Sequence, residues 1–194
     1  QTLNGGLFME KAVKVYHGSH ALFSEFYKDF IGVNANSEGR GFYFTDDCKI
    51  AERYAGENGY IYEVLFKGAK PLSSEGITIS RSELKTFLKA VHDKFDYLYD
   101  WGDVDTDGLE KVLETAVNGE LSGSSNDVDV IAGVCNLVGD NGGVLEVLFQ
   151  TLKYDSIITE ASWGREGFKQ TLYIALVTDV IEILNVSKRE KTAS

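Results

Sequence analysis

The sequence predicts an α+β domain built around a mainly antiparallel β-sheet. Short β-prone runs lie near both ends of the chain, and the region between them carries apolar residues at the three- and four-residue spacing of helices. The 194 residues, of which 43% are hydrophobic, suffice for one domain with its own core. Strands that come first and last, with helices between them, favour an antiparallel sheet over alternating strand and helix units.

The first predicted strands are rich in the β-branched and aromatic residues that strands favour. Val13–Tyr16 is a short run that ends in His17-Gly18-Ser19, and Gly41–Thr45 reads GFYFT. Another strand is predicted over Tyr60–Phe66, and Pro71 marks the exit from it.

A helix is predicted directly after the second strand. Asp46 or Asp47 can cap its first turn, and Gly56 is placed to end it. Its apolar positions share one face, which consists of Ile50, Ala51, Tyr54 and Ala55.

The middle of the chain is predicted to be helical. Ser82 begins the first helical pattern, and the predicted helices are Glu83–Phe95, Leu109–Val117, Val128–Val138 and Val144–Leu152. The stretch 140–143 (DNGG) is interpreted as a turn. Strands resume over Tyr154–Thr159, Leu172–Val177 and Val180–Leu184. We therefore expect a single domain over residues 9–188 with a helical acidic insertion at about 82–152, and flexible termini at 1–8 and 189–194.

The net charge of −11 is concentrated in one stretch. Residues 93–130 hold eleven acidic side chains and two lysines, which accounts for −9 of the total. Such a surface repels nucleic-acid phosphates and attracts a basic protein, although a solvated acidic face with no partner is the alternative. No apolar run is long enough to span a membrane, and two cysteines far apart in sequence favour a reduced, cytoplasmic setting.

The residues that carry chemistry include a histidine, a glycine, a serine and two tyrosines. His17-Gly18-Ser19 ends the first strand, and the segment GRGFYFTDDCKIAERYA places Tyr43 on the second strand and Tyr54 on the following helix. Together with the later run YIALVTDVI, these motifs resemble the NAD-binding core of ADP-ribosyltransferases of the diphtheria-toxin and poly(ADP-ribose) polymerase type. Within that family, the sequence is most similar in appearance to small bacterial and phage-encoded transferases. The resemblance does not cover residues 82–150.

The resemblance implies a fold with a split, twisted sheet and a site that binds NAD as co-substrate. Two tyrosines can sandwich a nicotinamide ring, and the backbone of a glycine allows its carboxamide to approach closely. In that family the histidine binds the ribose on the adenine side. The implied NAD-binding residues are His17, Gly18, Ser19, Tyr43, Ala51 and Tyr54, and His17 and Tyr43 are also implied catalytic residues.

The third catalytic position departs from the family pattern. The family usually has a glutamate there, which orients the ribose, but the alignment of TLYIALVTDVI places Leu172 at it. Gln170 lies two residues earlier, on the same face of the strand, and is the candidate to serve instead. Alternatively the site has no carboxylate, as in mono-ADP-ribosylating members whose substrate side chain helps to activate itself.

Asp103, Asp105, Asp107 and Glu114 reproduce the spacing of a calcium-binding loop. A capping box formed by Asp107 and Glu110 at a helix start explains part of the same pattern. We expect no bound metal, and the calcium alternative stays open.

The predicted function is NAD-dependent mono-ADP-ribosylation of a protein target, a pentosyl transfer, by a bacterial or phage effector. The alternative is a catalytically degenerate module of the same fold that binds NAD or another protein. Nucleic acid is disfavoured as a partner because of the acidic stretch.

Overall fold

The computed structural model describes residues 12–27, 41–95, 126–163 and 168–189. It contains a seven-stranded sheet with the strand order β4-β5-β6-β2-β1-β3-β7. All neighbouring strands are antiparallel except β4 and β5, which are parallel. The predicted α+β class with a mainly antiparallel sheet is therefore confirmed. The strands are β1 (Val13–Ser19), β2 (Phe42–Thr45), β3 (Tyr60–Phe66), β4 (Pro71–Ser73), β5 (Ser156–Trp163), β6 (Phe168–Ala175) and β7 (Ile181–Lys188).

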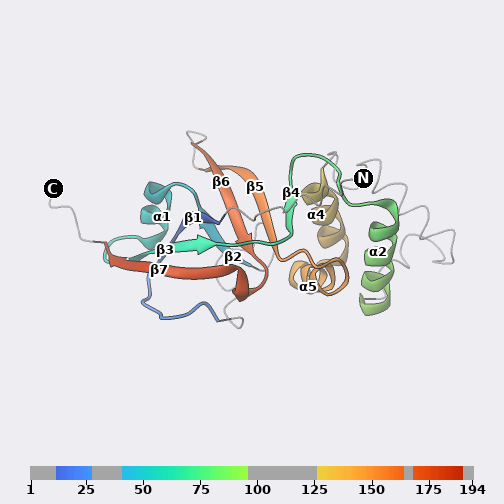
Figure 1. Cartoon of the computed structure of the whole chain (residues 1–194), viewed down its shortest axis with the longest axis horizontal. Coiled ribbons are helices and arrows are strands. Elements are labelled where there is room, and N and C mark those ends of the chain that lie inside the picture. The colour runs from blue at the N-terminus through green and yellow to red at the C-terminus, as the bar shows by residue number, and fades with distance from the viewer. Residues whose placement is uncertain (1–11, 28–40, 96–125, 164–167, 190–194) are drawn as a thin grey trace, which may run out of the picture.

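Four helices lie at the two ends of the described structure (Figure 1). Helix α1 (Cys48–Ala55) packs on β1 and β3 at one end, while α2, α4 and α5 gather at the other end, beside β4 and β5. The bounds of the latter three are α2 (Arg81–Phe95), α4 (Asp127–Val138) and α5 (Asn141–Leu152). A 3-10 turn, Thr178–Val180, connects β6 to β7.

The sequence signals placed α1 correctly. The side chain of Asp47 accepts a hydrogen bond from the amide of Lys49, and Gly56 ends the helix with a positive φ of 66°. The buried face consists of Ile50, Ala51 and Ala55, but Tyr54, which was expected on that face, is 49% exposed.

Strand β3 ends at Phe66, before Pro71, as predicted, but Pro71 also begins β4, a strand that the sequence did not predict. A proline is tolerated there because it is the first residue of an edge strand. Two local predictions were wrong. Helix α2 begins at Arg81, before Ser82, because Ser80, two residues before Ser82, forms a reciprocal capping box with Glu83. The stretch 140–143 is not a turn, since Asp140 caps α5 by accepting from the amide of Gly143.

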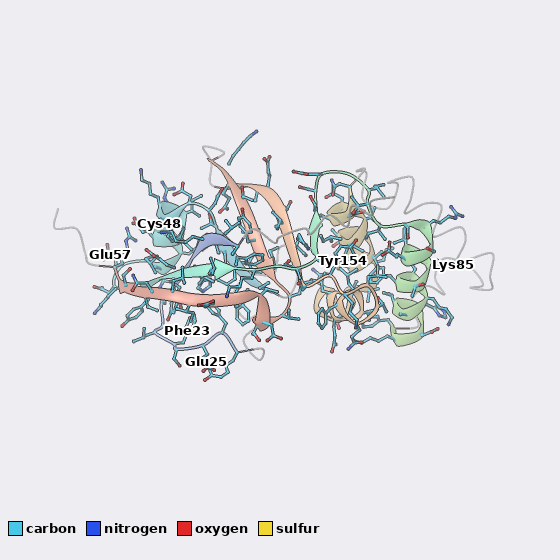
Figure 2. All side chains as sticks on the ribbon, viewed as in Figure 1. Phe23, Glu25, Cys48, Glu57, Lys85 and Tyr154 are labelled. Atoms are coloured by element: carbon cyan, nitrogen blue, oxygen red, sulfur yellow. The ribbon has the colours of Figure 1, made fainter. Side chains whose placement is uncertain are left out.

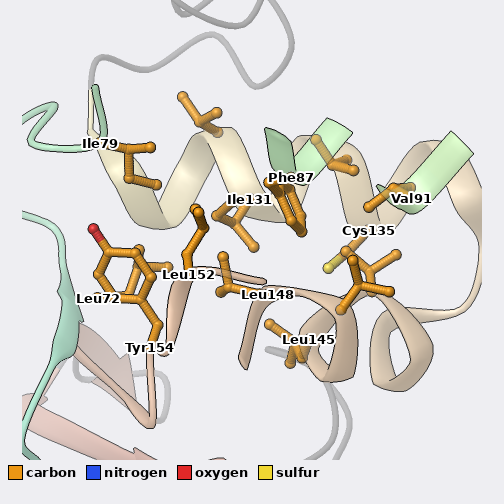
Figure 3. Close-up of a cluster of buried hydrophobic side chains, with 14 of the residues drawn as sticks. Leu72, Ile79, Phe87, Val91, Ile131, Cys135, Leu145, Leu148, Leu152 and Tyr154 are labelled. Carbon is orange, nitrogen blue, oxygen red and sulfur yellow. The ribbon is translucent and has the colours of Figure 1, made fainter. Parts of the chain in front are cut away.

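The helices α2, α4 and α5 share one hydrophobic cluster with the sheet (Figure 3). Phe87, Ile131 and Leu148 meet at its centre and are almost fully buried. From the sheet, Leu72, Ile157 and Ile174 extend the cluster across β4, β5 and β6. The described helices of the predicted insertion thus pack on the sheet, while a single domain over residues 9–188 remains a prediction.

The two faces of the sheet carry different clusters. Val15, Phe44 and Tyr62 lie on one face in a second cluster, with Phe23 and Phe26 packed over it. Tyr16 and Ile61 lie on the opposite face, where α1 covers them. Tyr16, which α1 covers, pairs with Thr45, so the two side chains lie on one face of the sheet. Tyr43 lies two residues from Thr45 on the same face and packs on the helical cluster. Helix α1 and the three other helices therefore cover the same face.

Close approach of α1 to the sheet depends on Gly18. A Cβ atom at this position would lie 1.9 Å from the carbonyl oxygen of Ala51 and 2.7 Å from the nitrogen of Ala55. Both atoms belong to the helix backbone, so no side-chain rotation can relieve the overlap.

The variant Gly18→Ala is therefore expected to lose about 3 kcal/mol of folding free energy, the upper end of overpacking costs. Gly139→Ala is the comparison, because a Cβ there meets nothing within 4 Å and only the positive φ of 72° opposes it, at a cost of about 1 kcal/mol. Urea unfolding of both variants measures the difference. Equal losses would show that α1 does not need the glycine.

Candidate active site

The candidate site begins where β1 and β2 separate. Strand β1 pairs with β3 along its whole length, but its described pairing with β2 consists of Tyr16 with Thr45 alone. If the antiparallel ladder continued, Gly18 would stand opposite Tyr43. Instead Gly18 and Tyr43 do not pair, and the sheet is split between β1 and β2 at this point.

The ring of His17 bridges this split. Its Nδ1 lies 2.8 Å from the backbone oxygen of Tyr43. A carbonyl oxygen only accepts hydrogen bonds, so Nδ1 carries the proton and donates it, which leaves Nε2 as an acceptor in the neutral ring. A side chain thus replaces the main-chain bond that the ladder would have made.

Aromatic rings surround His17. Its ring centroid lies 5.3 Å from that of Phe26, 5.7 Å from that of Phe44 and 6.0 Å from that of Tyr62. Burial among these rings lowers the pKa of His17 below its usual value, and the hydrogen bond to Tyr43 opposes this shift only in part. The imidazole is therefore neutral at physiological pH.

The side chains of His17 and Tyr43 lie on opposite faces of the sheet. His17 joins the aromatic cluster around Phe44, whereas Tyr43 is half-buried against the helical cluster on the α1 face. Figure 2 shows the same separation, with Phe23 and Cys48 on opposite sides of the sheet. The two residues meet through the carbonyl of Tyr43 at the split.

The other residues implied by the resemblance divide into exposed and buried positions. Tyr54 is half-exposed on α1, on the same face as Tyr43, and is accessible to a ligand. Ala51 is 1% exposed, and its carbonyl packs on Gly18, so it acts within the core between α1 and β1. The hydroxyl of Ser19 accepts a hydrogen bond from the amide of Ala21 and fixes the turn after β1.

Gln170 and Leu172 lie on the same face as Tyr43. Strand β6 pairs with β2, and Leu172 stands directly opposite Thr45. Gln170 lies two residues away and is 7% exposed, yet its Oε1 has no hydrogen-bond partner among the described residues. Since an unpaired buried acceptor is costly, this oxygen is suited to a donor supplied by a ligand or water.

Sequence reasoning missed the part that Asp46 plays beside Gln170. Its carboxylate accepts a hydrogen bond from the amide of Thr171, at 3.0 Å, and its own amide donates to the carbonyl of Thr171. The residue was considered only as a helix cap. The available signal was a pair of adjacent aspartates, Asp46 and Asp47, of which a helix cap needs only one.

A hollow of about 390 Å³ lies elsewhere, on the His17 face of the sheet. It is lined by Ser24, Glu25, Phe26, Thr178, Ile181 and Ile183, none of which was predicted as a site residue. The candidate calcium loop of Asp103, Asp105, Asp107 and Glu114 lies outside the described residues. Within the described ranges, no helix is long and apolar enough to cross a membrane.

The part-buried, neutral His17 is expected to make folding stability fall at acidic pH. Its folded pKa lies below the ordinary value of 6.5, so between these two values the unfolded chain binds more protons and the free energy of unfolding rises with pH. The contribution of His17 is complete above the ordinary pKa and is lost as the pH falls through the folded one.

Melting temperatures at about pH 7.5 and about pH 5.5, compared between the wild type and His17→Gln, isolate this effect because glutamine does not titrate. The wild type should lose more stability on acidification than the variant. An equal loss in both would mean that protonation of His17 does not oppose folding.

The comparisons with known proteins agree with this architecture. The sequence profile of the family described as "ADP-Ribosyltransferase in polyvalent proteins" matches residues 11–175, which include β1, β2, α1 and nearly all the described helices and strands. Neither the search of curated proteins nor the search of solved structures found a match. Because the profile spans most of the chain, the protein belongs to this ADP-ribosyltransferase family.

Proposed function

We propose that this chain is an NAD-dependent mono-ADP-ribosyltransferase that modifies a protein, with its site at the split between β1 and β2. Family membership supports ADP-ribosyl transfer in general. The observation that carries the specific proposal is the split itself, where the His17 ring holds the Tyr43 carbonyl and Gly18 stands at the unpaired position.

The residues present suit the parts of NAD. Tyr43 and the exposed ring of Tyr54 offer aromatic surfaces on one face for nicotinamide. The backbone of Gly18, which has no Cβ, offers a donor and an acceptor for a carboxamide. On the other side of the split, the Nε2 atom of His17 is an acceptor for a ribose hydroxyl. A ligand that contacts both tyrosines and His17 must therefore lie at the split.

Gln170 is suited to the third position. Its buried, unpaired Oε1 can accept a hydrogen bond from a hydroxyl of the ribose attached to nicotinamide. An amide is neutral, so it orients this ribose but stabilises the developing positive charge less than a carboxylate would. Leu172, which packs on the helical cluster, fills the position that the family gives to glutamate.

The reaction breaks the bond between C1′ of this ribose and nicotinamide. A nucleophile of the acceptor protein forms the new bond to C1′, and nicotinamide leaves with the bonding electrons. We infer transfer of single units because no carboxylate stands at the position to which the family assigns chain elongation. The chain contributes orientation of NAD, which is where most of the rate enhancement would arise.

The acceptor is proposed to be a basic protein. The chain carries a net charge of −11, and an acidic surface attracts a basic partner over a distance set by the ionic strength. The resemblance to small bacterial and phage-encoded transferases supports a role as an effector that acts on a host or rival protein. The setting proposed for this reaction is the cytoplasm, and nucleic acid is disfavoured as an acceptor.

Substitution of Tyr54 by alanine should weaken NAD binding without unfolding the protein. Loss of one stacking ring is expected to raise the Kd of NAD about twofold to tenfold. Tyr27→Ala is the matched control, since Tyr27 is 50% exposed and Tyr54 is 49% exposed. Titration calorimetry measures both.

The wild type should also melt at a higher temperature with saturating NAD. If the wild type does not bind NAD at millimolar concentration, NAD is not the co-substrate. If both tyrosine variants lose the same affinity for NAD, Tyr54 is not part of the binding site.

Gln170→Ala should lower turnover roughly tenfold to a thousandfold, the range for a single hydrogen-bonding group that acts in the transition state. Leu172→Ala is the comparison and should act through packing alone. Labelled NAD, a lysate as the source of acceptor and mass spectrometry of the products measure turnover, and acceptor-free hydrolysis of NAD is followed in parallel.

Full activity of Gln170→Ala would show that the site works without a polar third residue. In that case Leu172→Glu should raise acceptor-free hydrolysis of NAD by restoring a carboxylate. NAD binding without transfer or hydrolysis by the wild type would instead favour a catalytically degenerate module.

A further inference from the structure

A buried hydroxyl fixes the chain segment that follows the His17-Gly18-Ser19 motif. Tyr62 of β3 is fully buried, and its Oη accepts a hydrogen bond from the amide of Phe23 at 2.7 Å. The same hydroxyl proton is shared between two carbonyl oxygens, those of Ala21 at 3.3 Å and Phe23 at 3.2 Å. One side chain thus satisfies backbone groups of two residues that lie outside any strand or helix.

The ring of Tyr62 reinforces this attachment. It stacks on Phe23 with the centroids 4.2 Å apart and the planes 11° from parallel. Phe23 then meets Phe26 edge to face, with a centroid distance of 4.8 Å. The segment 21–26 is therefore held by polar contacts at the Tyr62 hydroxyl and by the aromatic packing of Phe23 and Phe26.

The attached segment encloses the ring of His17. Phe26 and Phe23 lie 5.3 Å and 6.2 Å from the His17 ring, which Tyr62 also contacts at 6.0 Å. The Nδ1 side of His17 is fixed by Tyr43. Access to Nε2, and the orientation of the ring, then depend on where this segment lies.

We propose that Tyr62 is a positioning residue for NAD binding: its hydroxyl holds the segment 21–23 against the sheet and thereby shapes the His17 side of the site. This inference rests on the proposed function, because the ligand at His17 is taken to be NAD. Tyr62 acts through Phe23 and Phe26 and does not itself touch the reacting atoms.

The hydroxyl is the informative part of Tyr62. A phenylalanine would fill the same space among Val15, Val64 and the neighbouring rings, so core packing alone does not call for a tyrosine. Burial raises the pKa of Tyr62, which keeps the hydroxyl protonated and able to donate. Without it, the amide of Phe23 would lose its acceptor, and the segment would lose its polar attachment.

The test compares Tyr62→Phe with Tyr173→Phe. Tyr173 belongs to the same cluster and lies on β6, but it does not hold the segment 21–23. Hydrogen exchange of the Phe23 amide, the Kd and KM for NAD, and kcat are measured for both variants and the wild type.

Tyr62→Phe is expected to speed exchange of the Phe23 amide and to raise the Kd and KM for NAD about threefold to tenfold, the effect of ordering one or two side chains on binding. Its kcat should stay within about twofold of the wild type, because interactions made only in the transition state are unchanged. Tyr173→Phe should change neither exchange nor affinity.

Unchanged exchange in Tyr62→Phe would overturn the attachment of the segment. Faster exchange with unchanged NAD affinity would overturn its role in positioning, and so would equal affinity losses in the two variants. Absence of NAD binding by the wild type would overturn the proposed function together with this role, and the exchange measurement would show separately whether Tyr62 holds the segment.

Discussion

The hydrogen bond from His17 to the backbone of Tyr43 is the contact around which the proposed site is organised. It lies where β1 and β2 stop pairing, and it keeps the two strands at a fixed distance without a main-chain ladder. A regular sheet would bury the backbone of Gly18 in hydrogen bonds to its neighbour. The split is therefore the proposed place for a ligand, and the histidine joins the two strands across it.

Packing on both faces supports this contact. On one face, α1 rests on Gly18 so closely that no side chain fits between them, and this fixes the helix that carries Tyr54. On the other face, the rings of Phe26, Phe44 and Tyr62 hold the imidazole in its neutral state. Tyr43 and Leu172, on β2 and β6, pack against the hydrophobic cluster that α2, α4 and α5 share with the sheet.

Local sequence patterns predicted most of the helices and strands, but they could not predict contacts between segments that are distant in the sequence. The α1 cap at Asp47 and the strand Tyr60–Phe66 follow from short-range signals and were predicted correctly. The capping box at Ser80 was also local but was overlooked. The face on which His17 lies, and the unpaired oxygen of Gln170, depend on strand pairings over more than 20 residues, which no local pattern encodes.

The most direct test of the account is to follow backbone amide signals by NMR while NAD is added. If NAD binds at the split, the signals of Gly18, Tyr43, Tyr54 and Gln170 should shift together with one binding constant, while those of the helical cluster around Phe87 and Leu148 stay in place. Shifts confined to the hollow lined by Ser24 and Ile183, or no shifts at millimolar NAD, would contradict a site at the split between β1 and β2.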